Sequence, residues 1–335
     1  MDACSTAELV ALDWGTSSCR AYLMRRDGRL LQQRANSSGI MHVTETARRE
    51  GRSRAEAFDQ ALRQLCSEWF TRATHPLPII AGGMIGSDQG WESTPYVDLP
   101  IDPLRIPLPL HPVPSSLGTV HIVPGLAVGG PLPGVMRGEE TQITGALLAE
   151  QDDNHPAQER VMVLPGTHSK WVYIREGVIT DFSTHMSGEF FALAMQESIL
   201  ARLHQPSREI DWDSYHRGVD IAMGESGRLG LLGILFSARS LALTGELERT
   251  GIGDYVSGLV IGSEVNQMVE HWLPRGVHHV DLLGDSSLCS RYTQALNRFD
   301  IAVTVADPHV TPRALAYLAD RAELFTAPTP SQEPC

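Results

Sequence analysis

The feature that constrains this chain most is a pattern that occurs twice along it. An apolar strand, a loop of sequence Gly-Thr-Xaa-Ser, a second strand, a turn and a third strand begin near Leu9 and again near Arg160. The two loops are GTSS at 15–18 and GTHS at 166–169. Short apolar runs separated by small polar turns are typical of β-hairpins. The repetition predicts two related α/β halves, each opened by a hairpin with a small polar tip.

The remaining pattern supports two domains, 1–150 and 151–335, joined by the polar linker at 151–159. A chain of 335 residues is long enough for about two domains. The Pro-rich stretch at 95–118 has no clear period and is expected to be a loop. Apolar spacing predicts helices at 52–72, 188–203, 226–243 and 253–271, one from Ser287, and a last one at about 311–324. This last helix can pack back on the first domain.

Composition excludes several classes of function. The net charge of −13, from 40 acidic against 27 basic residues, argues against nucleic-acid binding, which needs a basic face. The N-terminus has no basic region of a signal peptide, and the apolar run at 229–236 is too short to cross a membrane. Five scattered cysteines without CxxC spacing indicate reduced thiols. We therefore expect a cytoplasmic protein that binds small molecules.

The two loops have the composition of anion sites. Gly, Thr and Ser at a hairpin tip expose backbone N–H groups and hydroxyls, which bind phosphate. One such loop is most often an ordinary turn, but a matching pair favours a ligand with several phosphates. Asp13 precedes the first loop, and its carboxylate can face a phosphate only through Mg²⁺. Arg20 and Lys170, just past the loops, either neutralise phosphate oxygens or are plain strand-surface charges.

A third segment of interest is the strand-to-helix turn around Gly284. Asp285 or Ser286 is a suitable N-cap, and the glycine allows a flat group such as adenine to approach the backbone. A routine turn is the alternative. The sequence contains no P-loop, GxGxxG, GxSxG or HExxH motif.

Four stretches together resemble the 2-dehydro-3-deoxygalactonokinase family, within the superfamily of actin, sugar kinases and heat-shock ATPases. They are LDWGTSSCRAYL (12–23), AGGMIGSDQGWESTPYVDLP (81–100), VMRGEETQITGAL (135–147) and VLPGTHSKWVYIREGVITDFSTHMSGEFF (163–191). The resemblance implies two ribonuclease-H-like α/β domains with ATP in the cleft between them. It also implies ATP-dependent phosphorylation of 2-dehydro-3-deoxy-D-galactonate on its 6-hydroxyl, in galactonate breakdown.

The resemblance also assigns nucleotide-binding residues. Asp13 would organise Mg²⁺ through water, with Arg20 and Lys170 near the phosphates. The turn that starts at Gly284 would lie at the adenosine, although GDSS departs from the glycine-rich turn expected there. The assigned residues are Gly15, Thr16, Ser17 and Ser18 in the first loop, Gly166, Thr167, His168 and Ser169 in the second, and Gly284, Asp285 and Ser286 at the adenosine.

On the acceptor side, a carboxylate must orient the attacking hydroxyl and take its proton. Glu139, at a helix start, is the first candidate, with Glu140 second and Asp181 as a weaker rival. Alternatively, both glutamates only stabilise the helix N-terminus. Arg137 can hold the substrate carboxylate. The other substrate-binding candidates, on the glycine-rich loop, are Gly83, Met84, Ile85, Gly86, Ser87 and Trp91.

Two other functions are compatible with parts of the pattern. A phosphohydrolase acting on polyphosphate or guanosine pentaphosphate would share the Gly-x-Glu-Glu helix start, but it usually lacks a loop like GGMIGSDQGW. A sugar sensor would commonly carry a basic DNA-binding extension, which this sequence does not show. The sequence does not separate galactonate from gluconate epimers, and it is compatible with a homodimer.

Overall fold

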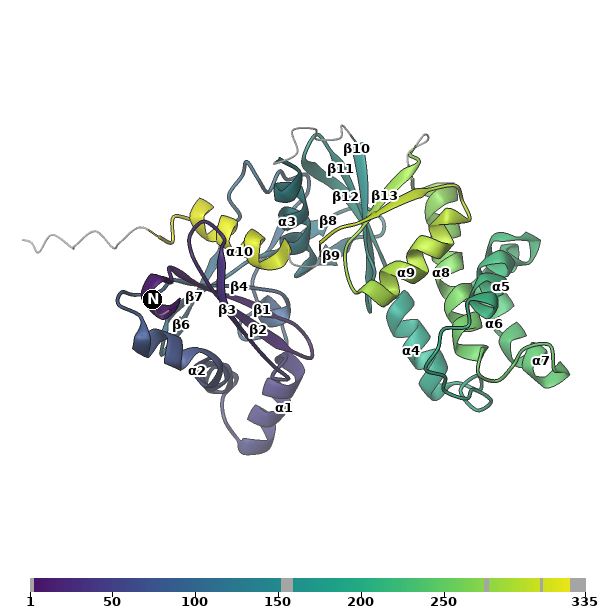
Figure 1. Cartoon of the computed structure of the whole chain (residues 1–335), viewed down its shortest axis with the longest axis horizontal. Helices are drawn as coiled ribbons and strands as arrows, with labels where there is room; N and C mark the ends of the chain where they lie inside the picture. The colour runs from purple at the N-terminus through teal and green to yellow at the C-terminus, as the bar shows by residue number, and fades with distance from the viewer. Residues whose placement is uncertain (1–2, 152–158, 274–276, 308–309, 326–335) are drawn as a thin grey trace, which may run out of the picture. The chain divides into compact units, whose positions relative to one another are not determined.

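The computed structural model describes residues 3–151, 159–273, 277–307 and 310–325 (Figure 1). Most of the predicted linker at 151–159 and Cys335 lie outside these residues. The chain forms two compact units. Unit 1 holds Met1–Pro156, Gly177–Ile179 and His309–Cys335, and unit 2 holds Ala157–Glu176 and Thr180–Pro308.

Unit 1 is built on a six-stranded sheet of order β3-β2-β1-β4-β7-β6. Strand β1 pairs antiparallel with β2 and parallel with β4, so the predicted opening hairpin is present. A small sheet of order β5-β8-β9 completes the unit. The strands are β1 (Leu9–Trp14), β2 (Cys19–Met24), β3 (Leu30–Asn36), β4 (Ile79–Gly82), β5 (Tyr96–Asp98), β6 (His111–Ser115), β7 (Gly118–Ile122), β8 (Gly125–Val128) and β9 (Gly134–Met136).

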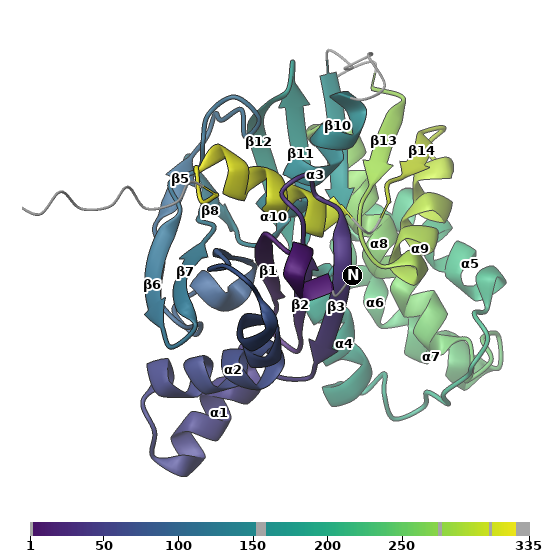
Figure 2. The same cartoon turned by 60° about the vertical axis from the view of Figure 1, so that its left-hand side comes forward.

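Helices cover both faces of this sheet. Helix α2 (Arg54–Arg72) contacts β2 and β3, while α10 (Val310–Arg321) contacts β1 and β4 and packs along α3 (Glu139–Gln151). Figure 2 shows α10 and α3 beside one another, and α2 with α1 (Ile40–Glu50) on the other side of the sheet. The predicted apolar face of α2 is confirmed, because its four positions are all buried: Ala57, Ala61, Leu65 and Trp69. Short 3-10 helices η1 (Ala3–Thr6) and η2 (Met84–Gly86) complete the unit.

The Pro-rich stretch at 95–118 is more ordered than the sequence predicts. It contains β5 and β6, and β6 pairs antiparallel with β7. Pro112 and Pro114 have no N–H to donate, so in a central strand each would leave a hydrogen bond of the sheet unmade. The two prolines are two residues apart, so their backbone nitrogens face the same side of the strand. Because β6 is the edge strand, that side can be the one without a neighbouring strand.

Unit 2 repeats the topology of unit 1. Its sheet has the order β12-β11-β10-β13-β14, which matches β3-β2-β1-β4-β7 strand for strand. The expectation of two related α/β halves is therefore confirmed. The strands are β10 (Glu159–Leu164), β11 (Ser169–Arg175), β12 (Val178–His185), β13 (His279–Leu282) and β14 (Ala302–Val305).

The helices of unit 2 differ from the predicted ones in three places. The helix predicted at 188–203 is shorter, because α4 covers only Ser187–Glu197. The region 226–243 is broken into η3, α6 and α7. Gly230, where η3 ends and α6 begins, has a φ of 74°, so one continuous helix cannot run through this position. Helix α5 was not predicted, although Asp211 caps it by accepting a hydrogen bond from the Ser214 N–H. The elements are α4 (Ser187–Glu197), α5 (Trp212–Met223), η3 (Glu225–Leu229), α6 (Gly230–Leu235), α7 (Ser237–Thr244), α8 (Ile252–His271) and α9 (Ser286–Asn297).

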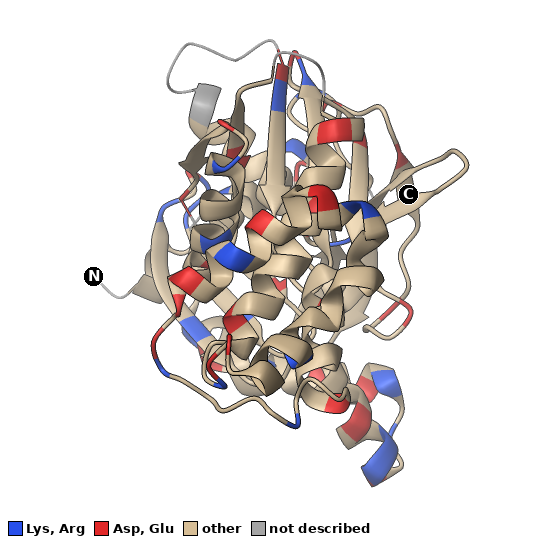
Figure 3. Ribbon diagram, turned by 90° about the vertical axis from the view of Figure 1, so that its right-hand side faces the viewer, with Lys and Arg blue, Asp and Glu red and all other residues tan. Residues whose placement is uncertain are grey.

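Charged residues of both signs are mixed on one face of the molecule. On the face that Figure 3 shows, basic and acidic positions are interspersed along the helices. Among the described residues, no helix is long and apolar enough to cross a membrane.

Candidate functional site

The first Gly-Thr loop is held in shape by helix α1. The N–H groups of Ile40 and Met41, at the start of this helix, donate to the carbonyl oxygens of Gly15 (3.0 Å) and Thr16 (3.2 Å). Gly39 lies against the loop so closely that a Cβ there would be 2.3 Å from the carbonyl carbon of Ser17. Thr16 and Ser17 remain exposed at the tip. The helix therefore fixes the loop backbone and leaves its tip free for a ligand.

Asp13 ends strand β1 next to this loop, and Arg20 is its cross-strand neighbour. The Arg20 guanidinium donates to Oδ2 of Asp13 at 3.2 Å. Burial raises the pKa of the Asp13 carboxyl, and the nearby Arg20 charge opposes that shift. The structure thus brings the two residues together at the edge of the loop, each paired with the other.

The residues around the loop fit a magnesium ion that is completed by a ligand. No cluster of three or more His, Cys, Asp or Glu occurs in the part of the chain that the structure describes. Mg²⁺ is commonly held by one or two carboxylates, water and substrate phosphates rather than by a full protein cage. Asp13 with exposed hydroxyls beside it is a donor set of that kind.

The second loop is held by the same device. The Glu189 N–H, in the first turn of α4, donates to the Thr167 carbonyl at 2.9 Å. A Cβ on Gly188 would lie 2.2 Å from the carbonyl oxygen of Gly166, so this glycine is needed for the approach. Nε2 of His168 lies 2.5 Å from a carboxylate oxygen of Glu189. In both halves, a glycine followed by a helix N-terminus clamps the carbonyl side of the loop.

Two residues predicted to bind phosphate, one in this loop and one just past it, are buried. The Ser169 side chain is fully buried and donates to Oε1 of Glu264 at 2.8 Å. Lys170 is only 4% exposed. Thr167 and His168 are the exposed members. Side-chain contacts with a ligand are therefore open to Thr167 and His168, whereas Ser169 is engaged with the protein.

The predicted adenosine turn lies beside the second loop. Strand β13 runs parallel to β10, so their ends meet at one edge of the sheet. The expected N-cap is confirmed: Asp285 accepts hydrogen bonds from the N–H groups of Ser287 (2.9 Å) and Leu288 (3.2 Å). A Cβ on Gly284 would lie 3.2 Å from the carbonyl oxygen of Pro165.

A cavity of about 110 Å³ opens next to this turn. It is lined by Gly166 from the loop, by the start of α4, and by α8 and α9. From α9 come Leu288, Arg291 and Tyr292, rather than the predicted residues at the turn itself. Among the described residues, Nη1 of Arg291 is buried without a hydrogen-bond partner. Arg291 and Tyr292 were not predicted, because one turn of helix separates them from the recognisable GDSS motif, and Leu288, directly after that motif, is an ordinary apolar residue.

The two candidate bases at the start of α3 have different surroundings. Glu140 is 1% exposed, and its Oε2 and Oε1 accept from the Gly138 N–H (2.6 Å) and the Thr141 hydroxyl (3.1 Å). Burial, with a smaller effect from the Glu139 charge, raises the pKa of Glu140 to about 8. Glu139 is half-buried, and its Oε2 accepts from the Arg137 N–H at 3.0 Å.

The Arg137 guanidinium is buried and makes hydrogen bonds within the protein. It is 8% exposed, its Nη2 donates to the Thr94 carbonyl at 2.8 Å, and its Nη1 donates to the Thr94 hydroxyl. Its guanidinium also lies 4.4 Å from the centre of the Tyr96 ring. The structure therefore turns this cation toward the residues that follow the glycine-rich loop.

The glycine-rich loop follows β4 and lies beside the end of β1. Gly83 has a φ of 95°, and a Cβ there would lie 2.8 Å from the carbonyl oxygen of Trp14. Ile85 and Trp91 are buried, and Trp91 packs on Trp14 at a ring distance of 6.2 Å. Met84 and Ser87 are the partly accessible members of the predicted set, and Gly86 is buried.

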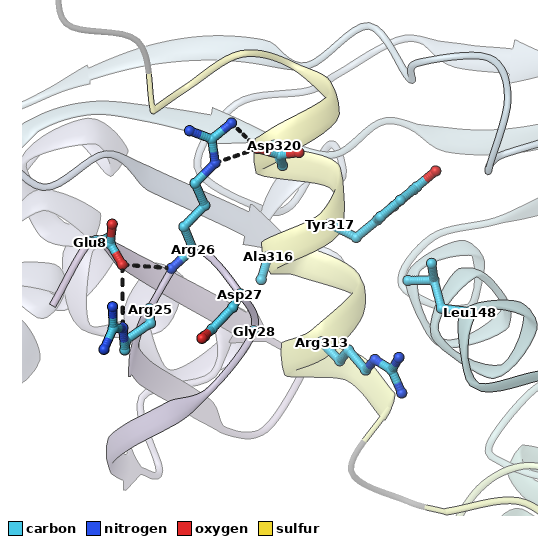
Figure 4. Close-up of a pocket in the computed structure, with 10 residues that line it drawn as sticks. All are labelled: Glu8, Arg25, Arg26, Asp27, Gly28, Leu148, Arg313, Ala316, Tyr317 and Asp320. Atoms are coloured by element: carbon cyan, nitrogen blue, oxygen red, sulfur yellow. Dashed lines mark hydrogen bonds and ion pairs between the residues drawn. The ribbon is translucent and has the colours of Figure 1, made fainter. Parts of the chain in front are cut away.

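A separate pocket of about 560 Å³ lies at the β2–β3 turn and α10 (Figure 4). Strand β2 runs from the first loop toward this turn, so the pocket is at the opposite end of the strand. Two of its arginines are paired with acids: Arg26 with Asp320 at 2.7 Å, and Arg25 with Glu8 at 3.6 Å. This pocket is not part of the candidate site.

Comparisons with known proteins cover nearly the whole chain. A family model described as 2-keto-3-deoxy-galactonokinase matches residues 13–317. The chain is similar to the 2-dehydro-3-deoxygalactonokinase of Escherichia coli, with 32% identity over 301 residues, covering 89% of this chain and 92% of the relative. A crystal structure from Sinorhizobium meliloti, described with the same activity, gives a TM-score of 0.79 at 29% identity, covering 94% of this chain and 99% of that one.

Proposed function

The chain belongs to the 2-keto-3-deoxy-galactonokinase family, and on this premise we propose that it phosphorylates 2-dehydro-3-deoxy-D-galactonate on its 6-hydroxyl, with ATP as donor. The product is 2-dehydro-3-deoxy-6-phosphogalactonate, an intermediate of galactonate breakdown. The observation that carries this function is the family match over residues 13–317, which includes both Gly-Thr loops and the α3 start. The alternative phosphohydrolase is not favoured, because the relatives reported above are described as kinases.

Each Gly-Thr loop binds phosphate oxygens of ATP in this proposal. Support comes from the exposed tips Thr16–Ser17 and Thr167–His168, and from the helix starts that fix the loop backbones. Backbone N–H groups and hydroxyls at such tips favour anions. Asp13 would hold Mg²⁺, which neutralises phosphate charge when it is bound. Arg20, already beside Asp13, is proposed to contact the phosphates.

The adenosine is proposed to bind in the cavity beside the second loop. Gly284, Asp285 and Ser286 border that region of the sheet, while Arg291 and Tyr292 line the cavity itself. The unpartnered Nη1 of Arg291 supports this proposal, because a purine nitrogen or ribose oxygen would satisfy it.

Glu139 is the proposed base. It is the more accessible of the two glutamates, and the Arg137 N–H orients its carboxylate. Glu140 is buried, and with a pKa of about 8 it is mostly protonated at neutral pH, so it is less suited to accept a proton. We assign Glu140 to holding the α3 start. Because Arg137 is engaged with Thr94, its proposed contribution to sugar-acid binding is to shape the loop at 83–87.

The proposal includes the cytoplasm as the compartment, since the four described cysteines are all buried and free. It also includes a homodimer, because Leu229, Leu232 and Phe236 around α6 are mostly exposed apolar side chains. Analytical ultracentrifugation tests the homodimer.

The deciding experiment is a coupled assay of ADP release with Mg²⁺-ATP. It compares the galactonate-derived and gluconate-derived 2-keto-3-deoxy acids with a control without sugar. We expect release to depend on the galactonate-derived epimer. Phosphate release that is independent of any sugar would support a phosphohydrolase instead.

The matched test of the base is Glu139→Gln. Its kcat should fall by at least about a hundredfold, the usual effect of losing a positioned base, while ATP binding is retained. Glu45→Gln, on the exposed surface of α1, is the control. Near-normal turnover in Glu139→Gln contradicts the assignment.

A further inference from the structure

Helix α8 carries a buried carboxylate to which the proposed mechanism gives no role. Glu264 lies in an apolar stretch of this helix and is 5% exposed. Glutamate is almost never this buried unless its oxygens are well satisfied. The residues that satisfy it show what it does.

Four neutral donors converge on this carboxylate. Oε1 accepts from the Ser169 hydroxyl at 2.8 Å and from the Trp171 indole N–H at 2.7 Å. Oε2 accepts from the Tyr292 hydroxyl at 2.9 Å and from the Ser187 hydroxyl. Burial keeps the pKa of Tyr292 well above its usual range, so this hydroxyl keeps its proton at neutral pH. Each carboxylate oxygen therefore receives two hydrogen bonds.

Two of these donors, Ser169 and Ser187, belong to the segments that build the second Gly-Thr loop, while Tyr292 lies on α9 and lines the cavity beside it. Ser169 is the last residue of the loop itself. Ser187 directly precedes Gly188, which packs on Gly166. The next residue, Glu189, holds the Thr167 carbonyl through its N–H. A single carboxylate thus sets both the end of the loop and the helix start that clamps its tip.

We propose that Glu264 is a positioning residue, which holds the loop at 166–169 in the shape that binds the phosphates of ATP. This inference rests on the proposed function, because it takes the loop to be a phosphate site. Glu264 acts through Ser169 and Ser187 rather than by touching the nucleotide.

The arrangement requires a carboxylate and not merely a polar side chain. A carboxylate only accepts hydrogen bonds and has about four acceptor positions, which matches the four donors. A glutamine has one acceptor oxygen, and its NH₂ group would face donors on the other side. The serine and tyrosine hydroxyls can rotate to accept, but the Trp171 indole N–H can only donate. Glu264→Gln therefore fills the same volume but breaks the pattern.

The test compares ligands with and without phosphates. Binding of a non-hydrolysable ATP analogue and of adenosine is measured by calorimetry on the full chain, in wild type, Glu264→Gln, Ser169→Ala and the double variant. The control is Trp171→Phe, which removes a neighbouring bond to the same carboxylate oxygen but leaves the loop contact. Thermal melting reports the stability of each variant.

We expect Glu264→Gln to weaken the ATP analogue at least about tenfold more than adenosine, as the loss of charge-assisted bonds predicts. Ser169→Ala should also weaken binding of the ATP analogue more than binding of adenosine. The double variant should weaken the ATP analogue little further than Glu264→Gln alone. Trp171→Phe should melt earlier but keep the wild-type ratio. If Glu264→Gln does not fold, the ratio in Ser169→Ala decides.

An unchanged ratio in folded Glu264→Gln, or an equal fall in Trp171→Phe, would overturn the proposal, because the carboxylate would then act on stability, or equally on the adenosine cavity through Tyr292, and not on the loop in particular. Wild-type protein that binds the ATP analogue but does not phosphorylate the sugar acid would contradict the proposed acceptor alone. The affinity ratio would still decide the role of Glu264.

Discussion

Replacing the buried Glu140 with glutamine should stabilise the protein relative to wild type, and this difference in stability should grow as the pH rises. Burial raises the pKa of this carboxyl to about 8 in the folded protein, against an ordinary value of 4.5. The folded state therefore prefers the protonated form. The contribution of this carboxyl to the free energy of unfolding is fully present below pH 4.5 and is lost as the pH rises through 8. Glutamine mimics the protonated carboxyl and has no proton to lose.

The magnitude follows from the size of the pKa shift. Each pKa unit corresponds to about 1.4 kcal/mol, so wild type should lose stability relative to Glu140→Gln by about that amount per pH unit between pH 4.5 and 8. The full difference is on the order of 5 kcal/mol above pH 8. The hydrogen bonds from Gly138 and Thr141 oppose the shift but are outweighed by burial.

The assay is urea denaturation of wild type and Glu140→Gln at pH 5, 6, 7, 8 and 9, followed by circular dichroism. Glu45→Gln, in an exposed ion pair with Arg48, is the control and should stay within about 1 kcal/mol of wild type throughout. A difference between Glu140→Gln and wild type that does not change from pH 5 to 8 would refute the reasoning. Glu140 would then be ionised in the folded protein and would compete with Glu139 as the base.

Three further predictions concern the loops. Gly39→Ala should destabilise the protein by at least about 2 kcal/mol in thermal or urea melts and weaken ATP binding, because its Cβ would overlap the first loop. The control Gly129→Ala, whose Cβ would lie in open space, should change both properties little. Arg137→Met should lower the free energy of unfolding by about 2 kcal/mol, because it leaves the Thr94 acceptors unpaired. It should also raise the KM for the sugar acid while leaving the KM for ATP unchanged. Equal shifts of both KM values would contradict this. Chelation by EDTA should abolish phosphoryl transfer reversibly, and Asp13→Asn should raise the Mg²⁺ concentration needed for half-maximal rate, whereas an unchanged Mg²⁺ dependence would exclude Asp13.

The repeated hairpin was the most informative part of the sequence for the fold. Each sheet contains the opening hairpin that the repeat predicted, because apolar strands and small turns are local signals. The edge strand β6 was not predicted, since the effect of Pro112 and Pro114 depends on whether a neighbour lies on their N–H side. Helix α5 was also missed, although Asp211 offered a capping signal.

The candidate site was only partly readable from the sequence. Motif residues such as Asp13 and the two loops stand out because their types and order are unusual. The sequence could not tell which of Glu139 and Glu140 is buried, because the two are adjacent at one helix start and have the same side chain. It also missed Glu264, for which an acid inside the apolar run SGLVIGSEV was the available sign.

By itself, the sequence determined the strand-loop-strand repeat, the small polar loop tips and the family to which the chain belongs. These depend on residue types at short spacing, where local geometry decides the outcome. The tertiary structure alone decided that Gly39 and Gly188 press helix starts onto the loops, that Glu140 is enclosed, and that Glu264 gathers donors from three other elements. Burial and hydrogen-bond partners arise from segments far apart along the chain, so they exist only once the elements have packed.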